Sequence, residues 1–249
     1  MYTLHHGDCL AVMPTLEANS VDTIICDLPY GTTSCRWDTV IPFAPMWEQV
    51  KRVIKPNGAI VLFGVQPFTS MLVAGNVKCY KHRWVWNKRQ PGNFAVAKFM
   101  PMSIDEDIVV FTSKGERVNY YPIMTTGKMR TKGGRHSLKN GRGFGGLANL
   151  EKHDSDQYFP KSILEFSVTP RQTSLHESQK PVDLLRYLVR TYSLVGQIIL
   201  DFTMGSGSTG VAALMEGRHF IGIEKDSHYF TVATDRIAQV QPALMEAAD

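Results

Sequence analysis

Residues 196–216, GQIILDFTMGSGSTGVAALME, decide the fold of this 249-residue chain. The apolar run that ends on Asp201 has the pattern of a buried strand, and the small residues after it open a helix. A buried run that ends on a carboxylate also occurs at residues 21–27 (VDTIICD) and 219–224 (HFIGIE). Strands of this kind that alternate with helices predict an α/β fold, with a mostly parallel sheet covered by helices on both faces.

Apolar spacing predicts the remaining regular elements. A helix over residues 43–55 ends at Pro56-Asn57-Gly58, before a buried strand over residues 59–64. Further strands are predicted at residues 83–87 and 108–111, and further helices at residues 184–192 and 230–240.

Composition is that of a soluble globular protein of one large or two small domains. The chain is 43% apolar, and its net charge of +4 is too small by itself to indicate a polyanion partner. No apolar run approaches the roughly 20 residues that cross a bilayer, and the first residues lack a leader pattern. The four cysteines form no C-x-x-C pair, which favours a cytoplasmic protein with reduced thiols and no metal site.

Residues 114–173 interrupt the alternation of strands and helices. They divide the chain into residues 1–113, an insert, and residues 174–249. A long irregular insert in a compact α/β domain is usually functional or mobile, although a basic segment is equally typical of a solvated loop. Within residues 128–142 the insert has no acid, and its basic side chains there are Lys128, Arg130, Lys132, Arg135, Lys139 and Arg142.

The glycine loop indicates a nucleoside-like cofactor. Gly205-Ser-Gly207-Ser-Thr-Gly210 fits G-x-G-x-x-G, and Glu224 ends the next strand, where it can meet a ribose. Taken alone, the pattern also fits a tight turn without a ligand. A dinucleotide is disfavoured because Asp201 would oppose its pyrophosphate, and because only about forty residues follow the loop. S-adenosylmethionine fits, since it has no phosphate and carries an ammonium that Asp201 would stabilise.

A second turn, Asp27-Leu28-Pro29-Tyr30, directly follows a buried strand. Asp27 and the Leu28 carbonyl can accept both N–H groups of an exocyclic amine and stabilise the positive charge that develops on it. Pro29 stiffens the turn, and Tyr30 offers a stacking face for a flat base. Taken alone, however, the tetrapeptide is more typical of an ordinary strand-to-loop turn.

Four motifs together resemble the amino-methylating DNA methyltransferases. They are the turn at 27–30, the loop at 201–209, the segment HESQKPVDLL at 176–185 and the opening GDCL at 7–10. Their order resembles the β class, in which the catalytic motif precedes the target-recognition region and the cofactor motif comes last. The resemblance covers nearly the whole chain outside residues 114–173. It implies a Rossmann-like S-adenosylmethionine-dependent methyltransferase fold.

The resemblance also implies roles for the motif residues. Asp27 and Tyr30 would be the catalytic acceptor and the stacking ring, and Leu28 and Pro29 would complete the catalytic turn. Within the cofactor pocket, Glu224 would bind the ribose and Asp8 the adenine amine. The full set of implied cofactor-binding residues is Asp8, Cys9, Asp27, Gln179, Lys180, Pro181, Asp201, Gly205, Ser206, Gly207 and Glu224.

By the same resemblance, residues 114–173 would recognise double-stranded DNA, with the six basic side chains on phosphates. The resemblance implies a bacterial or phage-encoded protein at the nucleoid, without a membrane. It leaves room for a homodimer and for a cognate restriction enzyme as further partners.

Two positions depart from the family pattern. Leu28 stands where proline is usual, and Phe202-Thr203 stands where Pro-Phe is usual. Leu28 keeps the carbonyl that takes part in the chemistry, so activity is expected to survive. The second change leaves the packing around the cofactor open.

The predicted reaction is methylation of the exocyclic amine of a flipped-out DNA base, with adenine N6 favoured. The open alternatives are N4 of cytosine, an amine in RNA, and a glutamine amide in a protein, which the basic insert disfavours. Two alternatives of another class are a DNA-binding protein that has lost turnover and a nicotinamide oxidoreductase, which Asp201 disfavours.

Overall fold

The computed structural model describes residues 1–32, 38–115, 117–135, 149–170, 175 and 179–240. The chain separates into two compact units, one formed by Met1–Tyr121 and Ser162–Asp249 and the other by Pro122–Lys161. The smaller unit spans fewer residues than the predicted insert at residues 114–173. The ends of that insert belong to the larger unit, because Val118 and Phe166 pack against its core.

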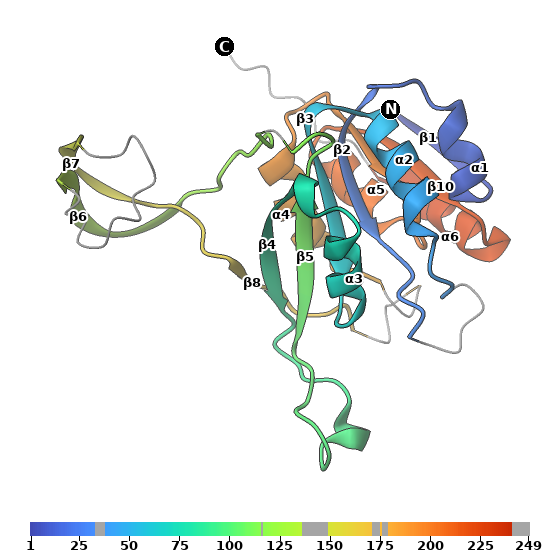
Figure 1. The fold of residues 1–249 in the computed structure, drawn as a ribbon, viewed down its shortest axis with the longest axis horizontal. Coiled ribbons are helices and arrows are strands. Elements are labelled where there is room, and N and C mark those ends of the chain that lie inside the picture. The colour runs from blue at the N-terminus through green and yellow to red at the C-terminus, as the bar shows by residue number, and fades with distance from the viewer. Residues whose placement is uncertain (33–37, 116, 136–148, 171–174, 176–178, 241–249) are drawn as a thin grey trace. The chain divides into compact units, whose positions relative to one another are not determined.

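The larger unit contains one eight-stranded sheet with the strand order β1-β10-β9-β2-β3-β5-β4-β8 (Figure 1). The five strands from β1 to β3 in this order are parallel, β5 is antiparallel to β3 and β4, and β8 is parallel to β4. The predicted mostly parallel sheet is therefore confirmed. The strands are β1 (Tyr2–His6), β2 (Val21–Asp27), β3 (Ile54–Gly64), β4 (Tyr80–Asn87), β5 (Asp105–Phe111), β8 (Ile163–Glu165), β9 (Ile198–Asp201) and β10 (His219–Glu224).

Helices cover both faces of this sheet, as predicted. Successive strand residues such as Ile24 and Ile25 belong to two different apolar cores, because side chains alternate across a strand. One core includes residues of α4, α5 and α6, and the other includes residues of α1, α2 and α3 (Figure 1). In the described ranges, no helix has the length and apolar character that a bilayer crossing requires. The helices are α1 (Cys9–Val12), α2 (Phe43–Val53), α3 (Phe68–Ala74), α4 (Val182–Tyr192), α5 (Ser208–Met215) and α6 (Ser227–Ala238), with short 3₁₀ turns at Met13–Thr15, Val77–Cys79 and Phe94–Val96.

The smaller unit contains a two-stranded antiparallel ribbon, β6 (Thr125–Arg135) with β7 (Asn149–Tyr158). This segment was expected to be irregular, and the difference has a physical cause. The described side chains of both strands are mostly exposed, so the sequence lacks the alternation of apolar and polar residues that marks a half-buried strand.

Candidate active site

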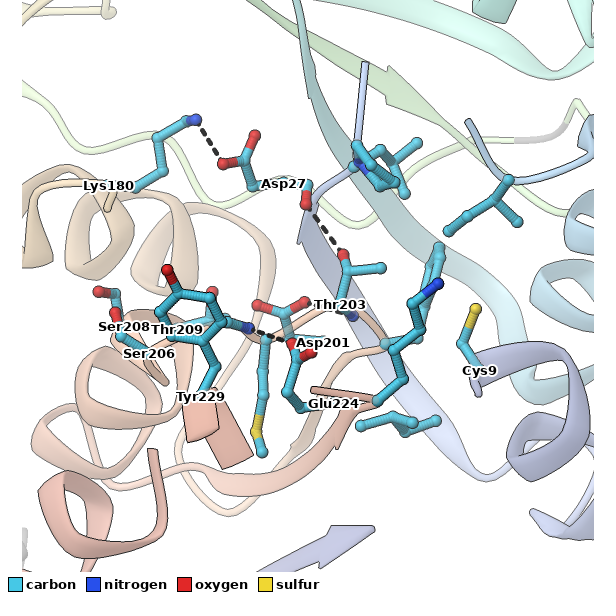
Figure 2. Close-up of a pocket in the computed structure, with 18 of the residues that line it drawn as sticks. Cys9, Asp27, Lys180, Asp201, Thr203, Ser206, Ser208, Thr209, Glu224 and Tyr229 are labelled. Carbon is cyan, nitrogen blue, oxygen red and sulfur yellow. Dashed lines mark hydrogen bonds and ion pairs between the residues drawn. The ribbon is translucent and has the colours of Figure 1, made fainter. Parts of the chain in front are cut away.

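The carboxyl ends of β1, β10, β9 and β2 meet at one edge of the sheet and line a pocket (Figure 2). A crevice at this edge is the usual ligand site of a parallel α/β sheet. The pocket brings together most of the predicted site residues: Asp8, Cys9, Asp27, Leu28, Pro29, Gln179, Lys180, Asp201, Gly205, Ser206 and Glu224.

Asp201 ends β9 inside this pocket and is only 3% exposed. Its Oδ1 accepts a hydrogen bond from the Thr203 N–H at 3.1 Å, and no lysine or arginine in the described part of the chain forms an ion pair with it. Burial raises the pKa of Asp201 to about 7. A buried carboxylate that lacks a cation fits the ammonium of S-adenosylmethionine.

Glu224 is the last residue of β10, the strand next to β9 in the sheet. Its Oε2 accepts from the Gly205 N–H at 2.9 Å, and its Oε1 accepts from the Asp226 N–H at 2.8 Å. Burial raises the pKa of Glu224. The backbone N–H of Lys225 is a third donor to this carboxylate, which has about four acceptor sites, so Glu224 can still accept a hydrogen bond from a ribose hydroxyl.

The three glycines of the loop have two kinds of role. Gly205 lines the pocket with a φ of 51°, and Gly207 is the N-cap of α5 with a φ of 78°. A Cβ on Gly207 or on Gly210 would lie 3.0 Å or 2.6 Å from the Ile237 side chain of α6. Gly207 was predicted to bind the cofactor, but it lies outside the pocket lining, where it permits close packing of α5 on α6.

Asp8 and Cys9 lie where β1 leads into α1. The Asp8 carboxylate accepts from the Leu10 N–H at 2.8 Å and so caps this helix. Burial, together with the charge of Asp8, raises the pKa of Cys9 to about 11. The thiol therefore stays protonated near neutral pH and forms part of the pocket wall. Pro181, also predicted here, is the N-cap of α4 and does not line the pocket.

Asp27 ends β2 on the opposite side of the pocket from Glu224 (Figure 2). The Lys180 ammonium lies 2.6 Å from its Oδ2, and the Tyr30 hydroxyl lies 2.7 Å from its Oδ1. Burial raises the pKa of Asp27, and the charge of Lys180 opposes this effect. Lys180 was predicted only to shape the edge of the cofactor pocket, and its contact with Asp27 was not foreseen.

The hydroxyl of Tyr30 also lies 2.8 Å from Oε1 of Glu106, a residue of β5 that the motifs did not indicate. The Tyr30 ring packs against Phe68 with a centroid distance of 5.0 Å, and it is not part of the pocket lining. Its proposed use as a stacking face for a base stays a prediction.

Thr203 connects the cofactor loop to the catalytic turn. Its hydroxyl donates to the backbone carbonyl of Asp27 at 2.9 Å (Figure 2). This bond gives a structural reason for the departure from the Pro-Phe pattern at residues 202–203, because neither proline nor phenylalanine could donate it.

We expect Thr203→Val to lower kcat about fivefold, because the loss of one neutral hydrogen bond of about 1 kcal/mol would loosen the Asp27 carbonyl without removing a charge. The affinity for S-adenosylmethionine should change by less than about twofold, since valine keeps the shape of the side chain. Steady-state methyl transfer and calorimetry would measure the two quantities, with Thr203→Ser as the control that restores the bond. A kcat equal to that of the wild type in Thr203→Val would contradict this role.

The predicted DNA-contacting residues fall into two groups. Lys128, Arg130, Lys132 and Arg135 lie on β6, and the side chains of Lys128 and Arg130 are exposed. Lys139 and Arg142 lie outside the described residues. The run is less uniformly basic in three dimensions than in sequence, because Asp154 of β7 is the cross-strand neighbour of Thr131.

Comparison with known proteins identifies the family. The sequence profile of the DNA methylase family, which covers N6 and N4 methyltransferases, matches residues 21–235. The chain belongs to this family. The protein is thus a DNA amino-methyltransferase, and the family's cofactor, S-adenosylmethionine, agrees with the chemistry of Asp201 and Glu224 in the pocket.

Individual relatives agree with this assignment. The type II methyltransferase M1.MboII of Moraxella bovis is 24% identical over 255 residues, which cover 96% of this chain and 97% of that protein. The solved structure of M1.HpyAVI with SAM has a TM-score of 0.61 and 22% identity, and covers 95% of this chain and 100% of that one. The cytosine-N4-specific PvuII DNA methyltransferase has a TM-score of 0.64 at 12% identity, and covers 100% of this chain and 88% of that one. Both solved structures support the fold.

Proposed function

We propose that this DNA methylase methylates N6 of adenine in double-stranded DNA, with the target base turned out of the duplex into the pocket. The observation that carries the proposal is that one pocket contains Asp27, Leu28 and Pro29 of the catalytic turn together with Asp201 and Glu224. An acceptor for an amine and two carboxylates suited to the cofactor are then within reach of one another.

The chemistry follows from the groups at the turn. S-adenosylmethionine, when bound, supplies an electrophilic methyl group. The Asp27 carboxylate and the Leu28 carbonyl accept the two N–H groups of the amine, which frees the nitrogen lone pair from the ring and stabilises the developing positive charge. The amine forms its new bond to the methyl carbon as the bond from that carbon to sulfur breaks, and a proton leaves the nitrogen afterwards. Most of the acceleration would come from holding the reactants in line and from this charge stabilisation.

DNA contacts are proposed for the β6–β7 ribbon. The exposed side chains of Lys128 and Arg130 suit phosphate groups, whose attraction for basic residues is independent of sequence and sensitive to salt. The homodimer, the restriction-enzyme partner and the cytoplasmic location are not required for this reaction and stay predictions.

A second candidate reaction is methylation of N4 of cytosine. The shared fold with the PvuII enzyme favours it, because that enzyme is cytosine-N4-specific. Both bases present a planar exocyclic amine, so the same turn could act on either.

We expect purified protein, incubated with tritiated S-adenosylmethionine and duplex DNA of mixed sequence, to yield N6-methyldeoxyadenosine after digestion to nucleosides. Chromatography against both methylated standards would identify the product. Label in N4-methyldeoxycytidine would support the second candidate, and DNA without label would contradict both. Single-stranded RNA of mixed sequence is the control substrate and should remain unlabelled.

A further inference from the structure

Five side chains beside the pocket form a connected group, which we call the ion cluster: Asp27, Tyr30, Lys88, Glu106 and Lys180. The contacts of Asp27 with Lys180 and Tyr30 are described above. Glu106 Oε1 lies 3.0 Å from the Lys180 ammonium, and its Oε2 lies 2.9 Å from the Lys88 ammonium. Two carboxylates and two ammonium groups thus balance one another within the cluster.

Glu106 itself does not line the pocket. It is 5% exposed and lies on β5 opposite Trp86 of β4. Besides Lys88, its side chain contacts two groups that also hold Asp27, namely the Tyr30 hydroxyl and the Lys180 ammonium. Glu106 is therefore connected to the pocket through the groups that contact Asp27.

The Asp27 and Glu106 carboxylates bind the same two donors, the Tyr30 hydroxyl and the Lys180 ammonium. The Tyr30 hydroxyl has one hydrogen, yet it lies 2.7 Å from Asp27 Oδ1 and 2.8 Å from Glu106 Oε1, so it donates fully to only one of them at a time. The Lys180 ammonium has three N–H donors and contacts Asp27 Oδ2 and Glu106 Oε1 at the same time, so the two carboxylates share its positive charge. Glu106 thus limits how strongly either donor binds Asp27.

We propose that Glu106 is a positioning residue for methyl transfer, which holds Tyr30 and Lys180 in place beside Asp27 while it keeps them from neutralising the Asp27 carboxylate. The inference rests on the role of Asp27 in the proposed function. It adds that the strength of Asp27 as an acceptor is set from β5, by a side chain that never touches the substrate.

The charges around Asp27 support this role. The groups that face it are Tyr30 of its own turn, Lys180 before α4, Glu106 of β5 and Asp201 of β9, and Lys88, just after β4, lies one contact further away. Burial raises the pKa of Asp27 most, Lys180 lowers it, and Glu106 raises it. If Glu106 lost its charge, Lys180 would interact with Asp27 alone. The pKa of Asp27 would fall, and the carboxylate would become a weaker acceptor.

The test uses Glu106→Gln and Lys88→Gln, which remove opposite charges from the cluster. We expect Glu106→Gln to lower kcat about ten- to a hundredfold, with KM for S-adenosylmethionine changed less than about twofold. The acid limb of its kcat–pH profile should move to lower pH, because Asp27 then ionises more easily. Lys88→Gln keeps Glu106 but removes a positive charge, so its acid limb should move to higher pH.

A purely structural role for Glu106 predicts a different result, in which activity falls but the acid limb stays where it is in both variants. That result, or a kcat for Glu106→Gln within about twofold of the wild type, would overturn the proposal. If Glu106→Gln does not fold, the direction of the shift in Lys88→Gln decides alone. Failure of the proposed function is recognised separately, because Asp27→Ala would then methylate DNA normally whatever Glu106 does.

Discussion

Asp27→Ala is expected to lower the rate of methyl transfer at least about a hundredfold, because it removes the acceptor that stabilises charge on the amine nitrogen. The affinity for S-adenosylmethionine should stay within about threefold of the wild type, since the ammonium and ribose carboxylates, Asp201 and Glu224, remain in place. Single-turnover transfer of tritium to DNA would give the rate, and calorimetry would give the affinity.

The variant should also fold, since Lys180 keeps Glu106 as an ionic partner at 3.0 Å after Asp27 is lost. Two single variants, Asp27→Asn and Glu165→Gln, make the same change from carboxylate to amide, and the second is the control. Glu165 forms an exposed ion pair with Arg89 at 3.3 Å, and its loss should leave the rate unchanged. Normal methylation by Asp27→Ala would show that the assigned chemistry is wrong.

Asp201→Asn is expected to weaken binding of S-adenosylmethionine about a hundredfold, because a buried carboxylate that pairs with the ammonium is replaced by a neutral group. Wild-type affinity should itself fall between about pH 8 and pH 6, since the pKa of Asp201 is raised to about 7 and the protonated carboxyl cannot pair with a cation. Calorimetric titrations across this range should find that the variant loses the part of the pH dependence that belongs to Asp201. Equal affinity in the two proteins at pH 8 would contradict the assignment.

The same substitution should stabilise the protein in the absence of cofactor. The folded protein holds the proton of Asp201 more tightly than the unfolded chain does, so the stabilising effect of protonation is lost as the pH rises through about 7. At pH 8 the variant should unfold with a free energy about 1–3 kcal/mol higher than the wild type, and the difference should shrink at pH 5. Urea unfolding at both pH values measures this effect. A carboxylate retained at such a cost is typical of a ligand site.

The sequence predicts the central part of the fold well. The bounds of β2 and β10 agree with prediction residue by residue, because a strand buried on both faces is a continuous apolar run whose end is marked by a carboxylate. Since parallel strands end at the same edge, Asp27, Asp201 and Glu224 could be assigned to one site before any coordinates were known.

The ion cluster could not be predicted in this way. The side chain of Glu106 meets Tyr30 only because β5 pairs with β4 in one particular register, with Glu106 opposite Trp86. In the sequence it is the middle residue of Asp105-Glu106-Asp107, which reads as a polar strand end. The motif at residues 176–185 places Lys180 only at the edge of the pocket. Its contacts with Asp27 and Glu106 depend on tertiary packing, which the motif does not contain.

Strands β1 and β10 are the first and the last along the sequence, and they pair side by side in the sheet. Gly7 and Asp8 follow β1, while Glu224 and Lys225 lie at the end of β10, and all four line the same pocket. A growing chain on the ribosome therefore lacks Glu224 and Lys225, and with them part of the pocket, until its last strand has emerged. In the complete protein, bound cofactor would contact both the segment after β1 and the end of β10. Its binding would therefore shift the folding equilibrium toward the fully assembled sheet by mass action.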